Sequence, residues 1–418
     1  MLLIKTSKMI RYTILTLSFL YLNLSFVSAQ TNKAMQQIKT DVVYLASDYL
    51  EGRETGLKGE QRAAEYIAWR FEAIGLEPKG DQGSWFNEFE FTFKSHPHDE
   101  NGEERIGRNV VAFLDNEAEN TVVIGAHYDH LGYGISGSRH TGESAVHNGA
   151  DDNASGVAAM LYVAEQLKSM SNTKANNYLF IAFSGEELGL IGSKKYVESP
   201  TVDLGAVNYM LNMDMVGRLN EEKTIAVAGV GTSPSWNTIL EKIKVGGIKT
   251  STTESGVGPS DHTSFYLEDI PVLHLFTGQH NEYHKPDDDS ELVNFRGLMA
   301  TSDFLLAIIK KANTLERLEF TATKNESEGR KSASYKVSLG VMPDYVFGGK
   351  GLRVDSVIED RPGHNAGIKA KDVIIKMGDL DVDDIYGYME GLAQYKKGDS
   401  CDVIVKRGDK EVMLKVTF

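Results

Sequence analysis

The stretch NYLFIAFSGEELGLIGS, residues 177–193, places two adjacent carboxylates, Glu186 and Glu187, directly after an unbroken apolar run. A continuous apolar run bounded by turn residues is typical of a strand that is buried on both faces of a parallel sheet. Neighbouring side chains point in different directions on strands and on helices, so the two carboxylates do not share one environment. The stretch therefore predicts a buried strand that ends at a polar site.

Similar apolar runs recur along the chain and alternate with helix-like segments. Strands are predicted at 109–115, 121–126, 177–183, 207–213, 224–229 and 271–277, and helices at 154–170, 233–244 and 295–313. Residues 41–81 add two helices around a Gly-rich turn. This alternation predicts an α/β fold with a mostly parallel central sheet flanked by helices.

The chain of 418 residues is long for one domain, and its composition changes after Lys311. We predict one large domain over 30–315, a polar linker over 316–333 and a small, mainly β unit over 334–418.

The first residues have the pattern of a secretory signal peptide. Lys5, Lys8 and Arg11 precede an apolar run that ends in small residues at Ala29. A membrane anchor is the alternative, but the apolar run is short for one. We predict cleavage after residue 29, no stable membrane anchor afterwards, and a periplasmic or extracellular location in a bacterium.

Charge and cysteine content limit the possible partners and ligands. Removing residues 1–29 removes three positive charges and no negative ones, which takes the formal net charge from −15 to −18. Such an acidic chain argues against a nucleic-acid partner. Cys401 is the only cysteine, so a metal site must be built from His, Asp and Glu.

Polar residues gather at the predicted carboxyl ends of the strands, and one lies before a helix. Parallel strands meet at one edge of a sheet, so these side chains should converge on one crevice. They are His127, Asp129, Asp151, Glu186, Glu187, Asp214 and His284. Each alone has an ordinary structural explanation, such as a helix cap or a hydrogen-bonded core histidine.

Together these residues would leave an uncompensated negative cluster unless cations bind there. Two histidines with several carboxylates suit zinc, and a carboxylate such as Asp151 can bridge two ions. Asp129 stands two residues after His127 and is a candidate for orienting its ring.

Five motifs make this pattern specific. GAHYDHLG, NGADDNASG, FSGEELGLIGS, NMDMVGR and EYHKPDDD resemble, in order and spacing, the co-catalytic di-zinc exopeptidase family. That family includes bacterial leucyl aminopeptidases, glutamate carboxypeptidases and glutaminyl cyclases. The resemblance covers about residues 35–312 and implies the zinc exopeptidase, phosphorylase/hydrolase-like fold.

The resemblance also implies roles for individual residues. Asp151 would bridge two zinc ions, with Glu187 and His284 completing one ion and His127 and Asp214 the other. Asp152 would lie in a cis-type peptide and be positional. Glu186 would be the general base for a metal-bridged hydroxide, and Tyr283 would lie near the oxyanion. SDHTSF (260–265) resembles a segment near the substrate pocket, so Asp261, His262 and Phe265 are predicted to line or support its rim.

The implied activity is that of a secreted aminopeptidase acting on peptides or proteins with free N-termini. A carboxypeptidase, a glutaminyl cyclase or an inactive peptide-binding protein are the alternatives. We interpret DDDSE (287–291) as a solvated turn, and His130, His140 and His147 as solvent-facing loop residues.

Residues 334–418 resemble a bacterial PDZ domain, most specifically in PGHNAGIKAKDVIIKMGD (362–379). The resemblance implies that backbone N–H groups around Leu339, Gly340 and Val341 bind the terminal carboxylate of a peptide ligand, which adds a strand to the sheet. A structural appendage that binds nothing is the alternative.

Overall fold

The structure is a computed structural model that describes residues 32–95, 102–170, 173–323, 337–343, 347, 349–357, 361–383, 385–408 and 410–418. The predicted signal peptide lies outside these residues. Among the described residues, no helix combines the length and the apolar character that a membrane crossing requires.

The large domain is built on a nine-stranded sheet in the order β1-β3-β5-β4-β6-β9-β7-β8, with β2 paired to β3. The strands are β1 (Glu77–Pro78), β2 (Phe86–Phe93), β3 (Glu103–Leu114), β4 (Thr121–His127), β5 (Asn177–Phe183), β6 (Val207–Met213), β7 (Thr224–Ala228), β8 (Lys249–Thr253) and β9 (Val272–Phe276).

The four central strands, β5, β4, β6 and β9, are parallel, whereas β3 and β7 join them antiparallel. All six predicted strands are present. Strands β1, β2 and β8 were not predicted, because none of them is a continuous apolar run. Strand β2 alternates buried and exposed residues, and β8 has no fully buried residue.

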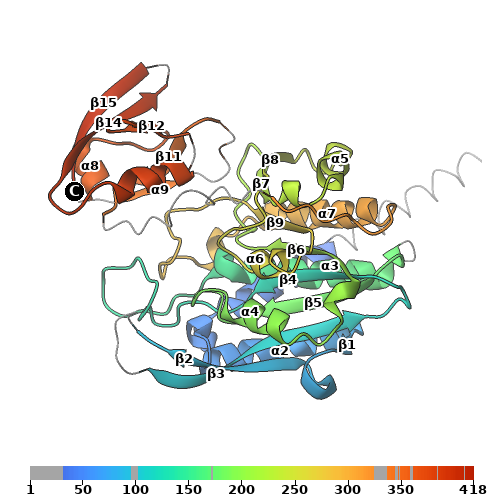
Figure 1. The fold of residues 1–418 in the computed structure, drawn as a ribbon. Coiled ribbons are helices and arrows are strands. Elements are labelled where there is room, and N and C mark those ends of the chain that lie inside the picture. The colour runs from blue at the N-terminus through green and yellow to red at the C-terminus, as the bar shows by residue number, and fades with distance from the viewer. Residues whose placement is uncertain are drawn as a thin grey trace, which may run out of the picture.

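Helices cover both faces of this sheet (Figure 1). Residues 32–45 form a helix that packs with α2 (Lys58–Ile74), α3 (Gly156–Ser169), α5 (Ser235–Glu241) and α7 (Phe295–Ala312) in the larger core. The opposite face carries α4 (Ile191–Glu198) and α6 (His262–Tyr266). Successive strand residues point to opposite faces, so Val110 lies in the first core and Val111 in the second. The predicted α/β fold is confirmed.

The first described part of the predicted linker belongs to the large domain. Leu318 is buried, and its N–H donates to Asn208 Oδ1 at 2.8 Å. Thr321 N–H donates to the carbonyl of Thr232 at 2.9 Å. The domain therefore extends to at least residue 323, and the remaining linker residues lie outside the described ones.

The C-terminal unit, drawn in red in Figure 1, has its own sheet and core. Its six strands are antiparallel neighbours: β10 (Val341–Pro343), β11 (Leu352–Val357), β12 (Val373–Met377), β13 (Leu380–Asp381), β14 (Ser400–Arg407) and β15 (Lys410–Thr417). Two helices, α8 (Pro362–Ala366) and α9 (Ile385–Ala393), accompany them.

Candidate metal centre

The predicted crevice forms at the carboxyl ends of the parallel strands. His127 is the last residue of β4, Glu186 and Glu187 follow β5, and Asp214 follows β6 directly. His284 comes from the loop after β9. Residues Ala150–Ser155 form the one-turn segment η3, which precedes α3 and carries Asp152 into the same place.

The donor atoms are spaced as the ligands of two tetrahedral zinc ions would be. Asp152 Oδ1 lies 3.3 Å from His127 Nε2, which in turn lies 3.3 Å from Asp214 Oδ1. Asp152 Oδ2 lies 3.3 Å from His284 Nε2, which lies 3.1 Å from Glu187 Oε2. Zinc bonds of about 2.0–2.1 Å in a tetrahedron separate the ligands by about 3.3 Å. The residues present therefore fit two zinc ions.

Asp152, and not Asp151, occupies the bridging position, so that part of the prediction is wrong. Each carboxylate oxygen of Asp152 faces a different histidine. The Asp151 carboxylate points away and accepts hydrogen bonds from Gly217 N–H at 2.6 Å and from Ser155 Oγ at 3.1 Å. Asp152 does lie in a cis peptide, which joins it to Asn153, but it is not merely positional as the resemblance implied.

Asp129 contacts both Glu186, the candidate general base, and His127, a candidate metal ligand. Its Oδ1 accepts a hydrogen bond from the backbone N–H of Glu186 at 3.2 Å and lies 3.6 Å from His127 Nδ1. The nearest acceptor for His127 Nδ1 is the Asp129 carbonyl oxygen at 3.2 Å. Thr55 Oγ1 donates to Asp129 Oδ2 at 2.9 Å. A proton on Nδ1 leaves Nε2 free for a metal ion, as a ligand histidine requires.

The protonation of the cluster reflects the close approach of these groups. Burial alone would raise the pKa of Glu187, but His284 and His130 lower it to about 2. Burial opposes protonation of His284, whose pKa is nevertheless raised to about 10 by Glu187 and Asp152. Burial raises the pKa of Glu186, which His127 opposes and Asp214 reinforces. The cluster thus holds protons that bound cations would displace.

Tyr283 lies beside the last ligand candidate. The Tyr283 ring stacks on the His284 ring, with centroids 3.8 Å apart. The Arg139 guanidinium lies 4.8 Å from the centroid of the Tyr283 ring. Arg139 N–H donates to the His284 carbonyl at 2.9 Å, and Gly137 provides an acceptor for His284 Nδ1 at 2.9 Å. The Gly/Ser-rich loop of residues 131–149 therefore holds the ring of His284 in place.

Several neighbours of the centre were missed or misjudged from the sequence. His130 and His147 are buried, and only His140 of the three loop histidines is exposed. Asp288 is also buried, so the solvated-turn interpretation is wrong for it. Its Oδ2 accepts hydrogen bonds from the N–H groups of Asp151 and Asp152 at 3.0 and 3.1 Å. The H-x-D-H spacing at 127–130 was the signal available for His130.

Arg53 holds together the segments that carry the centre, and it was not predicted from the sequence. Its guanidinium is buried and donates to the carbonyls of Leu45, Tyr128, Asn148 at 2.7 Å and Gly149 at 3.0 Å. These contacts connect the first helix, the end of β4 and the turn before η3. Burial lowers the Arg53 pKa to about 10, although Asp129 and Asp152 oppose this shift.

We expect Arg53→Lys to lower the free energy of unfolding of the large domain by about 2–4 kcal/mol, because an ammonium group cannot span these four acceptors. Urea unfolding followed by circular dichroism measures the change. Arg62→Lys is the matched control, since Arg62 is a partly exposed arginine over the Tyr49 ring and should change stability by about 1 kcal/mol or less. Equal effects of the two substitutions would contradict the role of Arg53.

The three predicted rim residues are fully buried, so none of them lines a surface. Phe265 packs in the core beside Phe183, and His262 stacks on His274 with centroids 4.4 Å apart. Asp261 is buried and lies near enough to His127 and Asp214 to interact with their charges. Burial raises its pKa to about 7, and His127 opposes that shift.

In the C-terminal unit, the predicted carboxylate loop precedes β10. Leu339 is buried, and its carbonyl accepts a hydrogen bond from Gly363 N–H at 2.7 Å. Gly340 has φ +70° and donates its N–H to Ser338 Oγ at 3.0 Å. Among the described strands, β10, which starts at Val341, pairs with β11 alone. Peptide binding at this edge stays a prediction.

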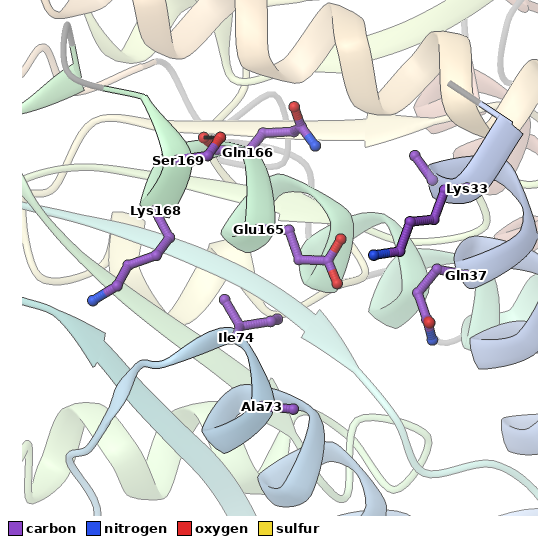
Figure 2. A pocket seen from close by; sticks show the side chains of 9 residues that line it. Lys33, Gln37, Ala73, Ile74, Glu165, Gln166, Lys168 and Ser169 are labelled. Atoms are coloured by element: carbon purple, nitrogen blue, oxygen red, sulfur yellow. Dashed lines mark hydrogen bonds between the residues drawn. The ribbon is translucent and has the colours of Figure 1, made fainter. Parts of the chain in front are cut away.

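A groove elsewhere on the large domain is a poor candidate for the functional site. It has a volume of about 480 Å³ and lies between the first helix, the end of α2 and the C-terminal end of α3 (Figure 2). Lys33, Glu165 and Lys168 are its charged residues, and no histidine lines it. The metal centre lies at the opposite, N-terminal end of α3.

The histidines and carboxylates at the ends of the parallel strands define an α/β protein with a candidate metal centre. Residues 109–309 match peptidase family M28, and residues 320–418 match the PDZ domain family. The large domain therefore matches peptidase family M28 and the C-terminal unit matches a PDZ domain, which confirms the resemblance that the sequence motifs indicated.

Similar proteins agree with this assignment. The chain is 30% identical over 273 residues to the probable lipoprotein aminopeptidase LpqL of Mycobacterium tuberculosis, across 62% of this chain and 49% of that protein. It spans about half or less of the length of the curated relatives that it matches first.

Two solved structures share the fold. A Zn-dependent exopeptidase from Parabacteroides distasonis has a TM-score of 0.53 and 16% identity, over 66% of this chain and 97% of that one. The glutaminyl cyclase of Porphyromonas gingivalis has a TM-score of 0.52 and 15% identity, over 66% and 98%.

Proposed function

We propose that this chain is an exported zinc aminopeptidase that removes N-terminal residues from peptides. The observation that carries the proposal is the placement of Asp152 between two histidines, each with a further carboxylate. His127, Asp152 and Asp214 would hold one zinc ion, and Asp152, Glu187 and His284 the other. The relatives named as aminopeptidases support the reaction class.

The residues around this centre have complementary roles in amide hydrolysis. Zinc ions bound there would polarise the scissile carbonyl and lower the pKa of water. Glu186, whose backbone is fixed by Asp129, would accept the proton of the attacking water and return it to the leaving amine. Asp129 would hold the Nδ1–H tautomer of His127 through its backbone carbonyl. Tyr283, beside His284, would donate from its hydroxyl to the developing oxyanion.

The second set of ligands favours a two-ion hydrolase over a single-zinc cyclase. The likeness to glutaminyl cyclase is a likeness of fold at 15% identity and carries no activity. A carboxypeptidase would keep the same centre but would bind the other end of the substrate. The PDZ domain would add a peptide partner with a free C-terminus through the edge of β10.

We expect removal of metal by 1,10-phenanthroline to abolish hydrolysis of aminoacyl p-nitroanilides, and addition of Zn²⁺ to restore it, because the carbonyl loses its polarising partner. N-acetylation of the substrate should prevent cleavage. The measurement is the release of p-nitroaniline and of free amino acids from a peptide panel.

A panel digest distinguishes the alternatives. Cleavage of N-acetylated peptides at the C-terminus would identify a carboxypeptidase, and formation of pyroglutamate would identify a cyclase. Zinc-loaded protein that cleaves none of the panel would contradict the proposed activity.

A further inference from the structure

We propose that His130 is a positioning residue whose Nδ1–H fixes Glu187, so that Glu187 presents a single oxygen to its metal ion. The inference rests on the proposed metal centre. It concerns a histidine that the sequence alone placed among solvent-facing loop residues.

The distances around Glu187 separate a hydrogen bond from a ligand contact. His130 Nδ1 lies 2.7 Å from Glu187 Oε1, which is the length of a charge-assisted hydrogen bond. His284 Nε2 lies 3.1 Å from Glu187 Oε2 and 3.3 Å from Asp152 Oδ2, near the tetrahedral ligand separation. Two ligands of one tetrahedral ion do not approach to 2.7 Å. His130 Nδ1 lies near enough to Asp152 and Glu187 to form a group of three donors with them, but its 2.7 Å distance to Oε1 is that of a hydrogen bond. We therefore place His130 outside the ligand set, as a donor to one oxygen of Glu187.

The tautomer of His130 follows from its partner. An ionised carboxylate only accepts hydrogen bonds, so Nδ1 must carry the proton toward Glu187. Among the described residues, His130 Nε2 is buried and has no hydrogen-bond partner. Within the described structure, Glu187 Oε1 is the one polar atom at hydrogen-bond distance from the ring, and Asp152 Oδ2 lies farther away, 4.0 Å from Nδ1.

Packing holds the ring in this orientation. The His130 side chain is 0% exposed, and its backbone N–H donates to the Arg53 carbonyl at 3.2 Å. A Cβ atom added at Gly149 would lie 2.5 Å from His130 Cδ2, so the ring rests directly on the glycine backbone. The cavity lined by His130, Glu187 and Leu188 has a volume of only about 10 Å³, so the ring has little room to turn.

The effect of His130 should be confined to one of the two ions. His130 contacts Glu187, and it also lies 4.0 Å from Asp152 Oδ2, the oxygen that faces His284. Among the described residues, no hydrogen bond or ion pair joins His130 to His127 or Asp214, which would complete the other ion. Loss of the Nδ1–H donor would let Glu187 rotate and weaken only the ion that it shares with His284. Residues that orient metal ligands typically change metal affinity about 10- to 100-fold.

The test is zinc binding to the full chain without its signal peptide, measured by competition with a chromophoric chelator. His130→Leu fills the space without a donor and should weaken one dissociation constant about 10- to 100-fold, with the other changed less than about threefold. His130→Asn places an amide N–H near the position of Nδ1 and should recover most of the affinity. His140→Leu, an exposed histidine of the same loop, is the matched control and should bind zinc as the wild type does.

Three results would overturn the inference. One is unchanged zinc affinity in a folded His130→Leu variant, and another is equal weakening of both ions in a variant whose metal-free circular dichroism and Tm match the wild type. The third is a folded His130→Asn variant as weak as His130→Leu. If His130→Leu fails to fold, comparison of His130→Asn with His130→Gln decides, because the longer amide lies near Nε2 and should not rescue.

The zinc measurement needs no peptide hydrolysis, which separates this inference from the proposed function. A wild type that binds two ions but cleaves no peptide would contradict the aminopeptidase proposal and leave the role of His130 intact. An active wild type whose His130 variants bind zinc normally would contradict only the role of His130.

Discussion

Glu186→Gln should lower kcat for aminoacyl p-nitroanilides by about 10²- to 10⁴-fold, the usual contribution of a general base, while the protein keeps its zinc. The amide has nearly the same shape as the carboxylate but cannot take a proton from water. The backbone N–H of residue 186 would still donate to Asp129, so the turn should keep its geometry. Steady-state kinetics together with metal analysis of the same preparation measures both parts of the expectation.

The matched control is Glu198→Gln on the exposed surface of α4, where the same chemical change should leave kcat unaltered. Glu187→Gln is a useful second variant for comparison, because it should weaken zinc binding as well as turnover. A Glu186→Gln variant with full activity would remove Glu186 from the mechanism. A variant that lost its zinc would assign Glu186 to the ligand set instead.

The adjacent residues Glu186 and Glu187 show how much of the fold and the site the sequence pattern could predict. The apolar run before them identified the buried strand, because a strand covered by helices on both faces must be apolar at every position. The same reasoning placed β4, β6 and β9, and the meeting of parallel strand ends predicted the crevice. The structure separates the contacts of the two residues, since Glu187 faces His284 and His130 whereas the backbone N–H of Glu186 donates to Asp129.

Residues in the loops could not be placed in the same way. Apart from the H-x-D-H spacing, nothing local distinguishes His130, which is buried against Gly149, from His140, which is exposed. Asp288 is one of three consecutive aspartates, and its burial depends on hydrogen bonds to η3, more than 130 positions earlier in the chain. These contacts depend on which loops pack over the strand ends, and periodicity carries no information about that packing.

The order of the two aspartates in NGADDNASG illustrates the same limit. Both are acidic, adjacent and at the start of a helix, so either could bridge two ions by composition alone. The structure distinguishes them by their partners. Asp151 Oδ1 accepts from Gly217 N–H and Ser155 Oγ, and Asp151 Oδ2 lies 3.3 Å from His280 Nε2. The two oxygens of Asp152 instead face His127 and His284.

This difference leads to opposite expectations for the same substitution at neighbouring positions. Asp152→Asn replaces one ligand oxygen with an NH₂ group that cannot coordinate, so zinc affinity should fall by more than about 100-fold, beyond the effect of residues that only orient ligands. Peptidase activity should fall with it. Asp151→Asn keeps an oxygen that can accept from Gly217 and Ser155, so the protein should keep both ions.

The expected cost of Asp151→Asn is a decrease of about 1–2 kcal/mol in the free energy of unfolding, because a charged acceptor becomes a neutral one in a buried site. Zinc titration and urea unfolding of the two variants, each prepared from the full chain without its signal peptide, measure these outcomes side by side. Loss of zinc in Asp151→Asn together with normal zinc binding in Asp152→Asn would restore Asp151 as the bridge. That result would require the η3 turn to be rotated by one residue, with the Gly217 hydrogen bond transferred to Asp152.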